Sequence, residues 1–378
     1  MAIEPFLLKR STQKNLLNMI ATTQPRNNHT LESHNQNSEA KQRVFDLMLT
    51  FVKSQCLYVS TRLGIFNLLD DQGEQSIESL AEQTNTDAER LYFILRGLAH
   101  VDILEEKPGR VFAPTEASTL LVTNKAPSAG HLAMHLIEPA QWDAWKVLPE
   151  ALEKGVVPFE LANGIGVYPY CYQNEWSKET FIKAMSFLTD SQVEGLLEAY
   201  DFGQYDVVMD VGGGQGGLIA SIVKRYGCKG VLFDLPDVAH TARDYMASQG
   251  VDTDDVEIKT GDVFESVPTG ANAIVMKHFI SAWSDEDAKK ILANCREALP
   301  ADGRLILLQS FVPDIDEPKT EADGIMPGIF AVQINVATPG GGWRTKKQFQ
   351  TLFEESGFKL ERVVKTSNSL SAMEFSVA

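Results

Sequence analysis

Apolar residues recur at spacings of three and four from Ala40 onward, in the stretch VFDLMLTFVKSQCLYVSTRLGIFNLL. This period predicts an amphipathic helix. Two of its turns are apolar nearly all round, which indicates burial against a second chain as well as its own. The segments SIESLAEQTNT and DAERLYFILRGLAHVDIL repeat the helical period, with Ser76 and Thr86 as predicted capping residues. The next segment, ILEEKPGRVFAPT, predicts two short strands joined at a Pro-Gly turn.

Two helices followed by a strand pair are typical of a winged helix, which we expect over residues 39–125. Such modules often bind DNA, but the second helix here has few basic residues, so we favour a dimerisation domain. Residues 1–38 are rich in Asn, Gln, Ser and Thr and have no sustained period, so we expect a mostly disordered tail. Because the tail is mildly basic and poor in acids, an organelle-targeting role is the alternative.

The pattern changes in the second half of the chain. A helical connector is predicted over residues 126–200, where it would form part of an acceptor pocket. After it, the short apolar runs VVMDV, VLFDL, VEIKT, AIVMK and RLILLQ alternate with helical segments such as LIASIVKRY and DEDAKKILANCREAL. The closing segments FKLERVVKT and SAMEFSVA can pair as a hairpin. This alternation predicts a doubly wound α/β domain over residues 201–378.

Charge and composition narrow the choice of partners. The formal net charge of −17 argues against nucleic acid, because a phosphate backbone attracts a basic surface. No apolar run approaches the ~18–20 residues that span a bilayer, and no signal peptide opens the chain. The four cysteines, Cys56, Cys171, Cys228 and Cys295, form no CxxC pair or Cys/His cluster. They favour reduced thiols in the cytoplasm over disulfides or structural zinc. With nucleic acid disfavoured by the charge, we expect a small molecule or a protein as the partner.

A glycine-rich loop, DVGGGQGG, follows the first strand of the second domain. Glycines let such a loop turn tightly beside a ligand, but the motif alone suits NAD, FAD or S-adenosylmethionine. Asp210 precedes the glycines, where it can orient the loop or meet a cationic ligand. Asp234 ends the second strand, placed for two ribose hydroxyls. Asp262 follows the third, where it can accept from an adenine amino group while Val263 packs on the ring. Together they predict a nucleoside site.

The chain resembles one family in a set of short motifs. They are DVGGGQG, FDLP, GDVF, MK followed by WSDED, and GGGWRT before ESGF. That family is the class I S-adenosylmethionine-dependent O-methyltransferases of the plant caffeate/flavonoid type and their bacterial natural-product relatives. The resemblance covers about residues 40–378 and implies a Rossmann-like domain behind a winged-helix dimerisation domain. It implies that Gly212 and Gly214 line the methionine end of S-adenosylmethionine and that Lys277 contacts the cofactor or its loop. It also places His135 and Met185 near the methyl acceptor.

The chain departs from this family where the chemistry is expected. In the family a histidine before the Trp-Ser-Asp sequence deprotonates the acceptor, and two acids orient it. The corresponding residues here are Ser281, Gln309 and Trp343. General-base assistance is worth ~10²–10⁴ in rate, and a phenol of pKa about 10 is ionised about one part in a thousand at pH 7. The site therefore suits an acidic enol, an electron-poor phenol or a neutral amine, whose methylation depends on alignment.

Two histidines are candidates to replace the missing base. His135 is the better placed, with a hydrogen-bonded histidine in the connector as the plain alternative. His278 lies beside Lys277 on a predicted strand, so the two side chains should point to opposite faces. His131 and His135 are four residues apart and could share a metal with Glu138. That set lacks a third firm ligand, so we expect no metal.

Aromatic residues are the remaining candidates for the acceptor pocket. Trp283 and Trp343, with Phe279 and Phe330, could form a cage for a flat acceptor, although core packing accounts for at least half of them. The sequence thus predicts a homodimeric methyltransferase for a small aromatic or polyketide-like metabolite, with oxygen favoured over nitrogen or carbon. One alternative keeps S-adenosylmethionine but catalyses hydroxylation or a pericyclic rearrangement. Another is a winged-helix regulator that senses S-adenosylmethionine.

Overall fold

The computed structural model describes residues 28–239, 241–251, 254–315, 321–340 and 343–378. The chain divides into two units, residues 1–53 and residues 54–378. The first long helix, α2 (Asn28–Arg62), begins before the first unit ends and continues into the second. It starts at Asn28 rather than near residue 39, so the expected tail is shorter than predicted. Residues 1–27 of that tail lie outside the described residues.

The part of α2 in the first unit carries a row of exposed apolar side chains. Their exposed fractions lie between 42% and 75%, and they are Val44, Phe45, Leu47, Met48, Leu49, Phe51 and Val52. A helix that leaves such a row in water lacks the partner surface that would bury it. None of the described helices is long and apolar enough to cross a membrane.

The amino-terminal part of the second unit has the expected succession of helices and strands. The elements are α3 (Ile65–Gln72), β1 (Gln75–Ser76), α4 (Ile77–Thr84), α5 (Ala88–Ala99), β2 (Leu104–Lys107), β3 (Val111–Pro114) and α6 (Glu116–Thr119). The strands form one sheet in the order β1-β3-β2, and β2 pairs with β3 around the Pro-Gly turn. Leu80, Leu95 and Phe112 fill the core, each with 0% of its surface exposed.

The amino-terminal cap of α4 agrees with the prediction, and that of α5 differs from it. Ser76 caps α4, and its side chain accepts a hydrogen bond from the backbone N–H of Ser79. The cap of α5 is Asp87, which accepts from the N–H of Arg90 at 2.9 Å, and not Thr86. The hydroxyl of Thr86 instead lies 2.9 Å from that of Thr84. The carboxylate, one residue closer to the helix, satisfies the free N–H groups better.

Six helices connect this part to the sheet. They are α7 (Ala129–Ile137), α8 (Pro139–Lys146), α9 (Leu148–Lys154), α10 (Pro158–Asn163), α11 (Val167–Gln173) and the long α12 (Glu175–Ala199). Helix α7 packs along α12, and α11 leads directly into it. The region therefore presents several short helices to the carboxyl-terminal domain rather than one connector helix.

The carboxyl-terminal domain is built on a seven-stranded sheet in the order β6-β5-β4-β7-β8-β10-β9. Its strands are β4 (Val207–Val211), β5 (Lys229–Asp234), β6 (Val256–Thr260), β7 (Ala273–Lys277), β8 (Arg304–Gln309), β9 (Phe358–Lys365) and β10 (Ser371–Val377). The first five are parallel, while β10 runs antiparallel to both β8 and β9. The predicted parallel strands and the closing hairpin are thus confirmed, but β6 lies at the edge of the sheet and buries only Val256, so its predicted burial is wrong.

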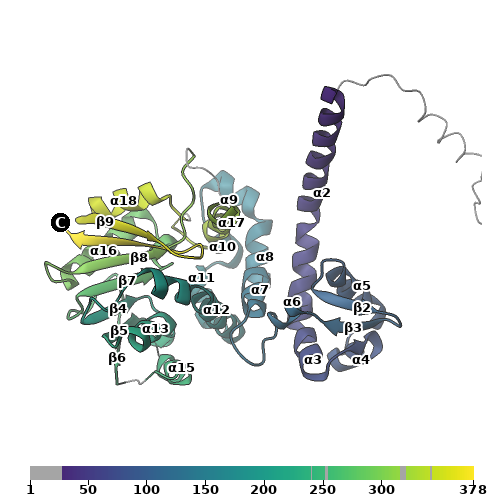
Figure 1. Cartoon of the computed structure of the whole chain (residues 1–378), viewed down its shortest axis with the longest axis horizontal. Coiled ribbons are helices and arrows are strands. Elements are labelled where there is room, and N and C mark those ends of the chain that lie inside the picture. Colours follow the sequence, from purple (N-terminus) through teal and green to yellow (C-terminus); the bar gives the residue numbers. More distant parts are fainter. Residues whose placement is uncertain (1–27, 240, 252–253, 316–320, 341–342) are drawn as a thin grey trace, which may run out of the picture. The chain divides into compact units, whose positions relative to one another are not determined.

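Helices cover both faces of this sheet (Figure 1). The alternation along β4 sends Val208 into one core and Met209 into the other. Helix α13 (Gly217–Tyr226) packs in the first core, and α16 (Asp285–Ala298) and α18 (Lys346–Glu355) pack in the second. The remaining elements are α14 (Pro236–Ala239), α15 (Ala242–Ser248), the 3₁₀ turn η1 (Ile280–Ala282) and α17 (Glu321–Ala337). The doubly wound, Rossmann-like fold class is confirmed.

Candidate active site

The glycine loop at the end of β4 is packed tightly at one residue and open at another. Gly212 has a φ of 71°, and a Cβ there would lie 2.3 Å from the ring of Phe279. Its N–H donates to the carbonyl of Phe233 at 2.9 Å, which ties the loop to β5. Gly214 has a φ of 61°, and a Cβ there would meet nothing within 4 Å. The backbone is therefore held firmly at Gly212, with free space above Gly214.

Asp234 holds the loop from the end of the neighbouring strand. One of its carboxylate oxygens accepts from the N–H of Gly214 at 2.8 Å, and the other accepts from the N–H of Leu235 at 2.7 Å. Burial raises the pKa of Asp234, and these two backbone hydrogen bonds oppose the rise. A carboxylate offers about four acceptor positions, so capacity for two further donors remains. Asp234 thus positions the loop and can still bind a ligand.

Asp262 and Val263 lie after β6, at the same edge of the sheet. Asp262 is exposed, and its carboxylate accepts from the N–H of Phe264 at 2.9 Å. The carbonyl of Val263 accepts from the side-chain amide of Asn294 at 2.7 Å. The turn is therefore held from both sides, by its own carboxylate and by helix α16.

Asp210 and Lys277 bring opposite charges beneath the loop. Only 2% of Asp210 is exposed, and burial raises its pKa to about 7 despite the opposing charge of Lys277. Burial likewise lowers the pKa of Lys277 to about 8, against the charges of Asp210 and Asp190. The ammonium group of Lys277 donates to the hydroxyl of Thr189 on α12 at 3.2 Å. Lys277 therefore links the end of β7 to helix α12.

The loop after β7 holds Ser281, the residue that stands where the resemblance leads us to expect a base. Ser281 is 1% exposed, and its hydroxyl donates to the carbonyl of His278 at 3.3 Å. Gln309 is fully buried at the end of β8 and donates to the carbonyl of Ser310 at 3.2 Å. Its carbonyl oxygen has no hydrogen-bond partner among the described residues. Neither side chain is arranged to take up a proton.

His278 differs from its predicted place because β7 ends at Lys277. The residue adopts a left-handed φ of 52°, and its ring stacks on Trp343 with centroids 5.4 Å apart and planes at 8°. Its side chain does diverge from that of Lys277, which reaches Thr189. Burial and the charge of Lys277 lower the pKa of His278 to about 3, and Gln309 opposes this only in part. The ring is neutral and a weak base.

The motifs WSDED and GGGWRT, far apart in the sequence, lie against each other. A Cβ on Gly340 would lie 2.2 Å from the backbone of Trp283, so only glycine fits there. The guanidinium of Arg344 donates to the carbonyl of Trp283 at 2.9 Å and to the carboxylate of Asp285 at 2.6 Å. These contacts fix Trp343, the neighbour of Arg344, beside the β7 loop.

The four predicted cage aromatics fall into two groups. Trp343 contacts Phe330 at 5.3 Å between ring centroids, and Trp283 contacts Phe279 at 6.2 Å. Trp283 also packs on Tyr168 of α11, with ring centroids 6.1 Å apart. Sequence reasoning did not single out Tyr168, although the aromatic run YPYCYQ in a helical region was a signal for it.

Met185 lies half-buried on α12. Its carbonyl accepts from the hydroxyl of Thr189, the residue that accepts from Lys277. The structure therefore places Met185 one helical turn from the end of β7. Its contact with the methyl acceptor, which the resemblance implied, stays a prediction.

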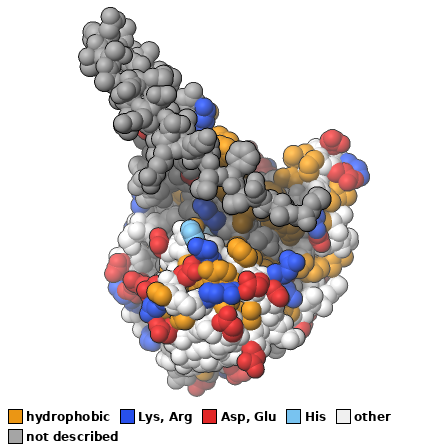
Figure 2. Space-filling model, turned by 90° about the vertical axis from the view of Figure 1, so that its right-hand side faces the viewer, with side chains coloured by type: hydrophobic (Ala, Val, Ile, Leu, Met, Phe, Trp, Pro, Cys, Tyr) orange, Lys and Arg blue, Asp and Glu red, His pale blue; other side chains and the backbone are white. Residues whose placement is uncertain are grey.

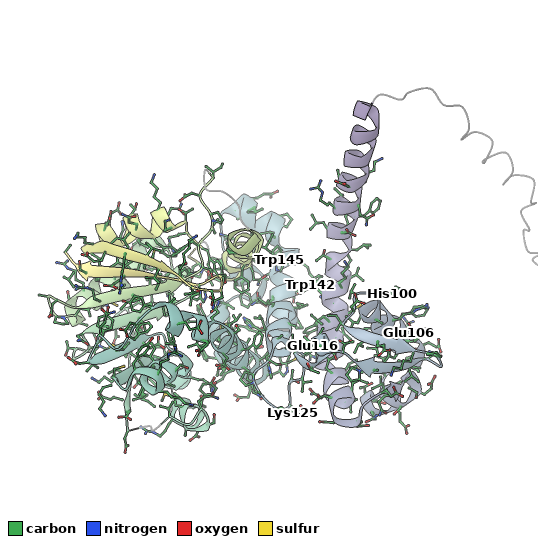
Figure 3. All side chains as sticks on the ribbon, viewed as in Figure 1. His100, Glu106, Glu116, Lys125, Trp142 and Trp145 are labelled. Carbon is green, nitrogen blue, oxygen red and sulfur yellow. The ribbon has the colours of Figure 1, made fainter. Side chains whose placement is uncertain are left out.

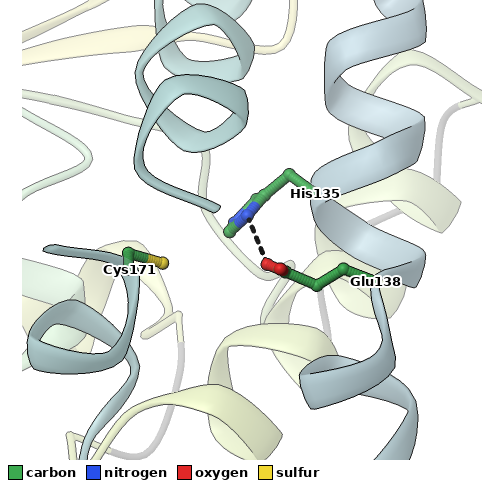
Figure 4. Close-up of side chains that lie close together, drawn as sticks. All are labelled: His135, Glu138 and Cys171. Atoms are coloured by element: carbon green, nitrogen blue, oxygen red, sulfur yellow. Dashed lines mark ion pairs between the residues drawn. The ribbon is translucent and has the colours of Figure 1, made fainter. Parts of the chain in front are cut away.

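His135 lies at the end of α7 in a small group of buried polar residues. Its Nδ1 atom is 3.4 Å from a carboxylate oxygen of Glu138, and the two residues are 7% and 2% exposed. Figure 4 shows the thiol of Cys171, on α11, turned toward this pair, and one ligand atom from each residue lies within 4.8 Å of the others. The other oxygen of Glu138 accepts from the hydroxyl of Ser177 at 2.6 Å.

His131, whose spacing would let it share a metal with His135, has a different role. Its Nδ1 atom lies 3.1 Å from the hydroxyl of Ser128 and accepts from the N–H of Ser128 at 3.2 Å, which caps α7. The structure thus brings Cys171, and not His131, to His135 and Glu138. Nothing in the local sequence pattern relates Cys171 to α7, since they belong to separate helices.

Two surface hollows lie away from the glycine loop. One of about 730 Å³ is lined by residues at the start of α16, in the segment after α17 and along α18: Ser284, Asp285, Pro339, Gly340, Trp343, Arg344, Lys347, Gln348, Thr351, Leu352 and Glu355. The other, of about 480 Å³, is bordered by His100 at the end of α5 and by Glu106 of β2, which Figure 3 labels. Trp343 is the one proposed acceptor residue that either of them includes.

Comparisons with known proteins agree with this geometry. An O-methyltransferase domain matches residues 145–359, and an O-methyltransferase dimerisation domain matches residues 45–124. The chain is 32% identical to the phenazine O-methyltransferase of Lysobacter antibioticus over 323 residues, which is 85% of this chain and 92% of that one. It is 29% identical to the mitomycin biosynthesis 6-O-methyltransferase of Streptomyces lavendulae over 325 residues, covering 85% and 90%.

A solved structure shows the same arrangement with a cofactor product bound. The calicheamicin biosynthesis methyltransferase CalO1, in its S-adenosylhomocysteine-bound form, superposes with a TM-score of 0.73 at 26% identity. The match covers 90% of this chain and 98% of that one. The fold and the loop edge thus define an S-adenosylmethionine-dependent methyltransferase. The chain belongs to the O-methyltransferase family whose members join a dimerisation domain to a methyltransferase domain.

The residues at the loop edge fit S-adenosylmethionine. The free space above Gly214 leaves room for a ligand against the backbone. Asp234 retains acceptor capacity beside it, and the half-buried Val263 offers an apolar surface further along the edge. Asp210 lies beneath the same loop. When bound, the cofactor supplies a methyl group on a positively charged sulfur.

Proposed function

We propose that the protein transfers a methyl group from S-adenosylmethionine to a hydroxyl of a small aromatic or polyketide-like metabolite, without the histidine base that the family has before the Trp-Ser-Asp sequence. The observation that carries this proposal is the contrast between the ends of β5 and β7, the strands on either side of β4. From the end of β5, Asp234 clasps the intact glycine loop that follows β4, while the loop after β7 holds the buried Ser281. The cofactor half of the reaction is therefore kept, and the usual proton acceptor is absent.

In this proposal the protein's residues mainly bind and align. Gly212, Gly214 and Asp234 position the cofactor, with Asp262 and Val263 at its adenine. Positioning of two reactants can supply ~7–11 kcal/mol of the barrier, against about 3–5 kcal/mol for a general base. Alignment alone is therefore sufficient for an acceptor that ionises readily.

The acceptor would lie on the α7–α12 side of the β7 loop. We propose that Met185, Trp283 and Trp343 contact it and that His135 is the residue that acts on its hydroxyl. Ser281 is proposed to line the site without moving a proton, because its hydroxyl is held by the carbonyl of His278. The helices of residues 126–200 would form the wall opposite the catalytic domain, residues 201–378.

A nitrogen acceptor is the second candidate. A neutral amine needs no deprotonation before it attacks, so the loss of the base does not penalise it. Two relatives bear N-methyltransferase names. One is the 8-amino-8-demethylriboflavin N,N-dimethyltransferase of Streptomyces davaonensis, at 30% identity, and the other is nicotinate N-methyltransferase 1 of Glycine max, at 28%.

We propose that the protein works as a homodimer in the cytoplasm, through the dimerisation domain of residues 39–125. The exposed apolar row of α2 supports a second chain as the missing partner surface. The four cysteines are all free and buried, which suits a reducing compartment.

The wing does not offer a surface for nucleic acid in this proposal. Its cations are neutralised by acids: Lys107 by Glu74, and Arg110 by Glu89, with shortest distances of 2.6 Å and 2.7 Å. Figure 2 likewise shows acidic and basic side chains intermingled on the face that it displays. A phosphate backbone would have to compete with each of these pairs.

A label-transfer experiment tests the proposal. The purified protein is incubated with methyl-labelled S-adenosylmethionine and a panel of phenols, enols and arylamines, with Asp234→Ala as the inactive control. Label in an oxygen-methylated product supports the proposal, and label only in amines establishes the second candidate. A product that forms while S-adenosylmethionine is recovered intact would establish a hydroxylation or rearrangement instead. Retardation of duplex DNA at physiological salt would instead favour a winged-helix regulator that senses S-adenosylmethionine.

A further inference from the structure

We infer that His135, Glu138 and Cys171 form a binding site for one divalent ion of the zinc class. The three residues come from the end of α7, the turn between α7 and α8, and α11. They supply a ring nitrogen, a carboxylate oxygen and a sulfur, which is a donor set that zinc binds in proteins. All three are buried, with exposed fractions of 7%, 2% and 0%.

The distance between His135 and Glu138 fits two ligands of one metal ion better than it fits a hydrogen bond between the two side chains. His135 Nδ1 and the nearest oxygen of Glu138 are 3.4 Å apart, yet Nδ1 is buried and makes no hydrogen bond to any described residue. Two such atoms on a tetrahedral zinc ion, each about 2.0–2.1 Å from the metal, are themselves about 3.4 Å apart. A histidine base oriented by a carboxylate would instead donate a hydrogen bond along that line.

The thiol needs only a small adjustment to complete the set. The three ligand atoms lie within 4.8 Å of one another. A sulfur and a nitrogen on the same zinc ion are about 3.6 Å apart, so a movement of roughly 1 Å brings Cys171 into place. The thiol proton passes to water when the metal binds, and the sulfur donates its freed electron pair to the ion.

A supporting contact resembles those found around metal ligands. The second oxygen of Glu138 accepts from the hydroxyl of Ser177 at 2.6 Å, and Ser177 is 1% exposed at the start of α12. Hydrogen bonds of this kind orient a ligating carboxylate and raise metal affinity. The ring of His135 also packs against the ring of Phe181 on α12, with centroids 5.1 Å apart, and this contact helps to hold the imidazole in place.

Three protein ligands leave a fourth position on a tetrahedral ion, as catalytic zinc sites do. The aromatic row from Phe181 to Tyr168 and Trp283, with ring centroids 6.1 Å apart at each step, connects this group to the β7 loop. An acceptor hydroxyl in the fourth position would lose its proton to water more readily. Its oxygen would then form the new C–O bond as the S–CH₃ bond breaks, leaving that electron pair on sulfur. This catalytic part rests on the proposed function.

Binding of zinc alone provides the first test. The full-length protein, free of any polyhistidine tag, is stripped with a chelator and titrated with Zn²⁺ by calorimetry. Co²⁺ is then used to detect a thiolate-to-metal absorption band. We expect one Zn²⁺ per chain. His135→Gln and Cys171→Ser should each weaken binding more than about 100-fold, and Ser177→Ala about 10–100-fold.

Two matched variants serve as controls. His131→Gln changes a buried histidine on the same helix, and Cys228→Ser changes a buried thiol elsewhere, and both should retain full affinity. The melting temperature of every variant shows that it is folded. A wild-type protein that binds no more zinc than the double variant His135→Gln/Cys171→Ser would overturn the site.

The same proteins separate this site from the proposed function. If zinc binds as expected but the chelated protein methylates its acceptor at an unchanged rate, the site stands and its catalytic part is wrong. If zinc binds and no acceptor in the panel is methylated, the site stands and the proposed function fails. A lower rate in the chelated protein that Zn²⁺ restores, with S-adenosylmethionine affinity unchanged, supports both.

Discussion

The cofactor edge and the acceptor side of this site differ in how completely their polar groups are satisfied. At the cofactor edge, both oxygens of Asp234 accept backbone hydrogen bonds, and Lys277 donates to Thr189. On the proposed acceptor side, His135 Nδ1 and Trp283 Nε1 are buried without a hydrogen-bond partner among the described residues. An unsatisfied buried group costs ~1–3 kcal/mol. The cofactor edge is therefore held in place by the protein's own hydrogen bonds, whereas the proposed acceptor side leaves buried polar atoms that a ligand can satisfy.

The largest expected effect comes from removing the clasp on the cofactor edge. Asp234→Ala deletes the acceptor for the N–H of Gly214 and the proposed partner of two ribose hydroxyls. We expect calorimetric affinity for S-adenosylmethionine to fall more than about 100-fold, since each hydrogen bond to a charged group contributes ~1.5–3 kcal/mol. Asp244→Ala, an exposed acid on α15, is the control and should bind normally. Parent-like affinity in Asp234→Ala would contradict the assignment.

Alanine substitutions at two glycines of the same loop should separate an effect on protein stability from an effect on cofactor binding. Gly212→Ala places a Cβ 2.3 Å from Phe279, so we expect a loss of about 2–3 kcal/mol in the free energy of unfolding. Gly214→Ala meets no protein atom and should cost only about 1 kcal/mol for its left-handed backbone. Its Cβ would instead enter the space proposed for the cofactor.

Denaturant unfolding and calorimetry on the same two proteins check this contrast. Gly214→Ala should lose affinity for S-adenosylmethionine by at least about tenfold while remaining nearly as stable as the parent. If the space above Gly214 is not used by the cofactor, the affinity of Gly214→Ala will equal that of the parent protein.

The buried carboxyl beneath the loop predicts a pH dependence of stability. Burial raises the pKa of Asp210 from 3.8 to about 7, so the folded protein holds this proton more tightly than the unfolded chain. The resulting stability is fully present below about pH 4 and is lost as the pH rises through about 7. Asp210→Asn imitates the protonated acid and should remove about 1–3 kcal/mol of this change between pH 4 and 8.

Denaturant unfolding at a series of pH values measures this effect. Asp206→Asn changes an exposed acid near the start of β4 and should leave the wild-type pH profile unchanged. A profile for Asp210→Asn that coincides with the wild type would show that Asp210 does not titrate in this range.

The smallest effect is expected at the residue that replaces the missing base. Ser281→Ala removes one hydrogen bond to the carbonyl of His278, and turnover should stay within about tenfold of the parent. Steady-state rates on an accepted substrate measure this directly. A loss near the ~10³ typical of a general base would show that Ser281 takes part in proton transfer.

Local patterns were sufficient for the fold and for the position of the glycine loop and the acids at one edge of the sheet. The parallel strands, the glycine loop and the acids at Asp210, Asp234 and Asp262 all follow from residues close together in the sequence. Only finer features were missed there, such as the cap at Asp87 and the end of β7 before His278. Each depends on one or two hydrogen bonds at an element boundary, where the periodic signal ends.

The sequence by itself determined the elements, the nucleotide-type loop and the presence of Ser281 two residues before Trp283. Only the tertiary structure decided that Cys171 joins His135 and Glu138, that Tyr168 packs on Trp283, and that Gly340 lies against the Trp283 backbone. The physical reason is that a helical period specifies which face of a segment is buried but not which distant segment covers it. That choice depends on how whole helices pack, and the acceptor side is built from such contacts.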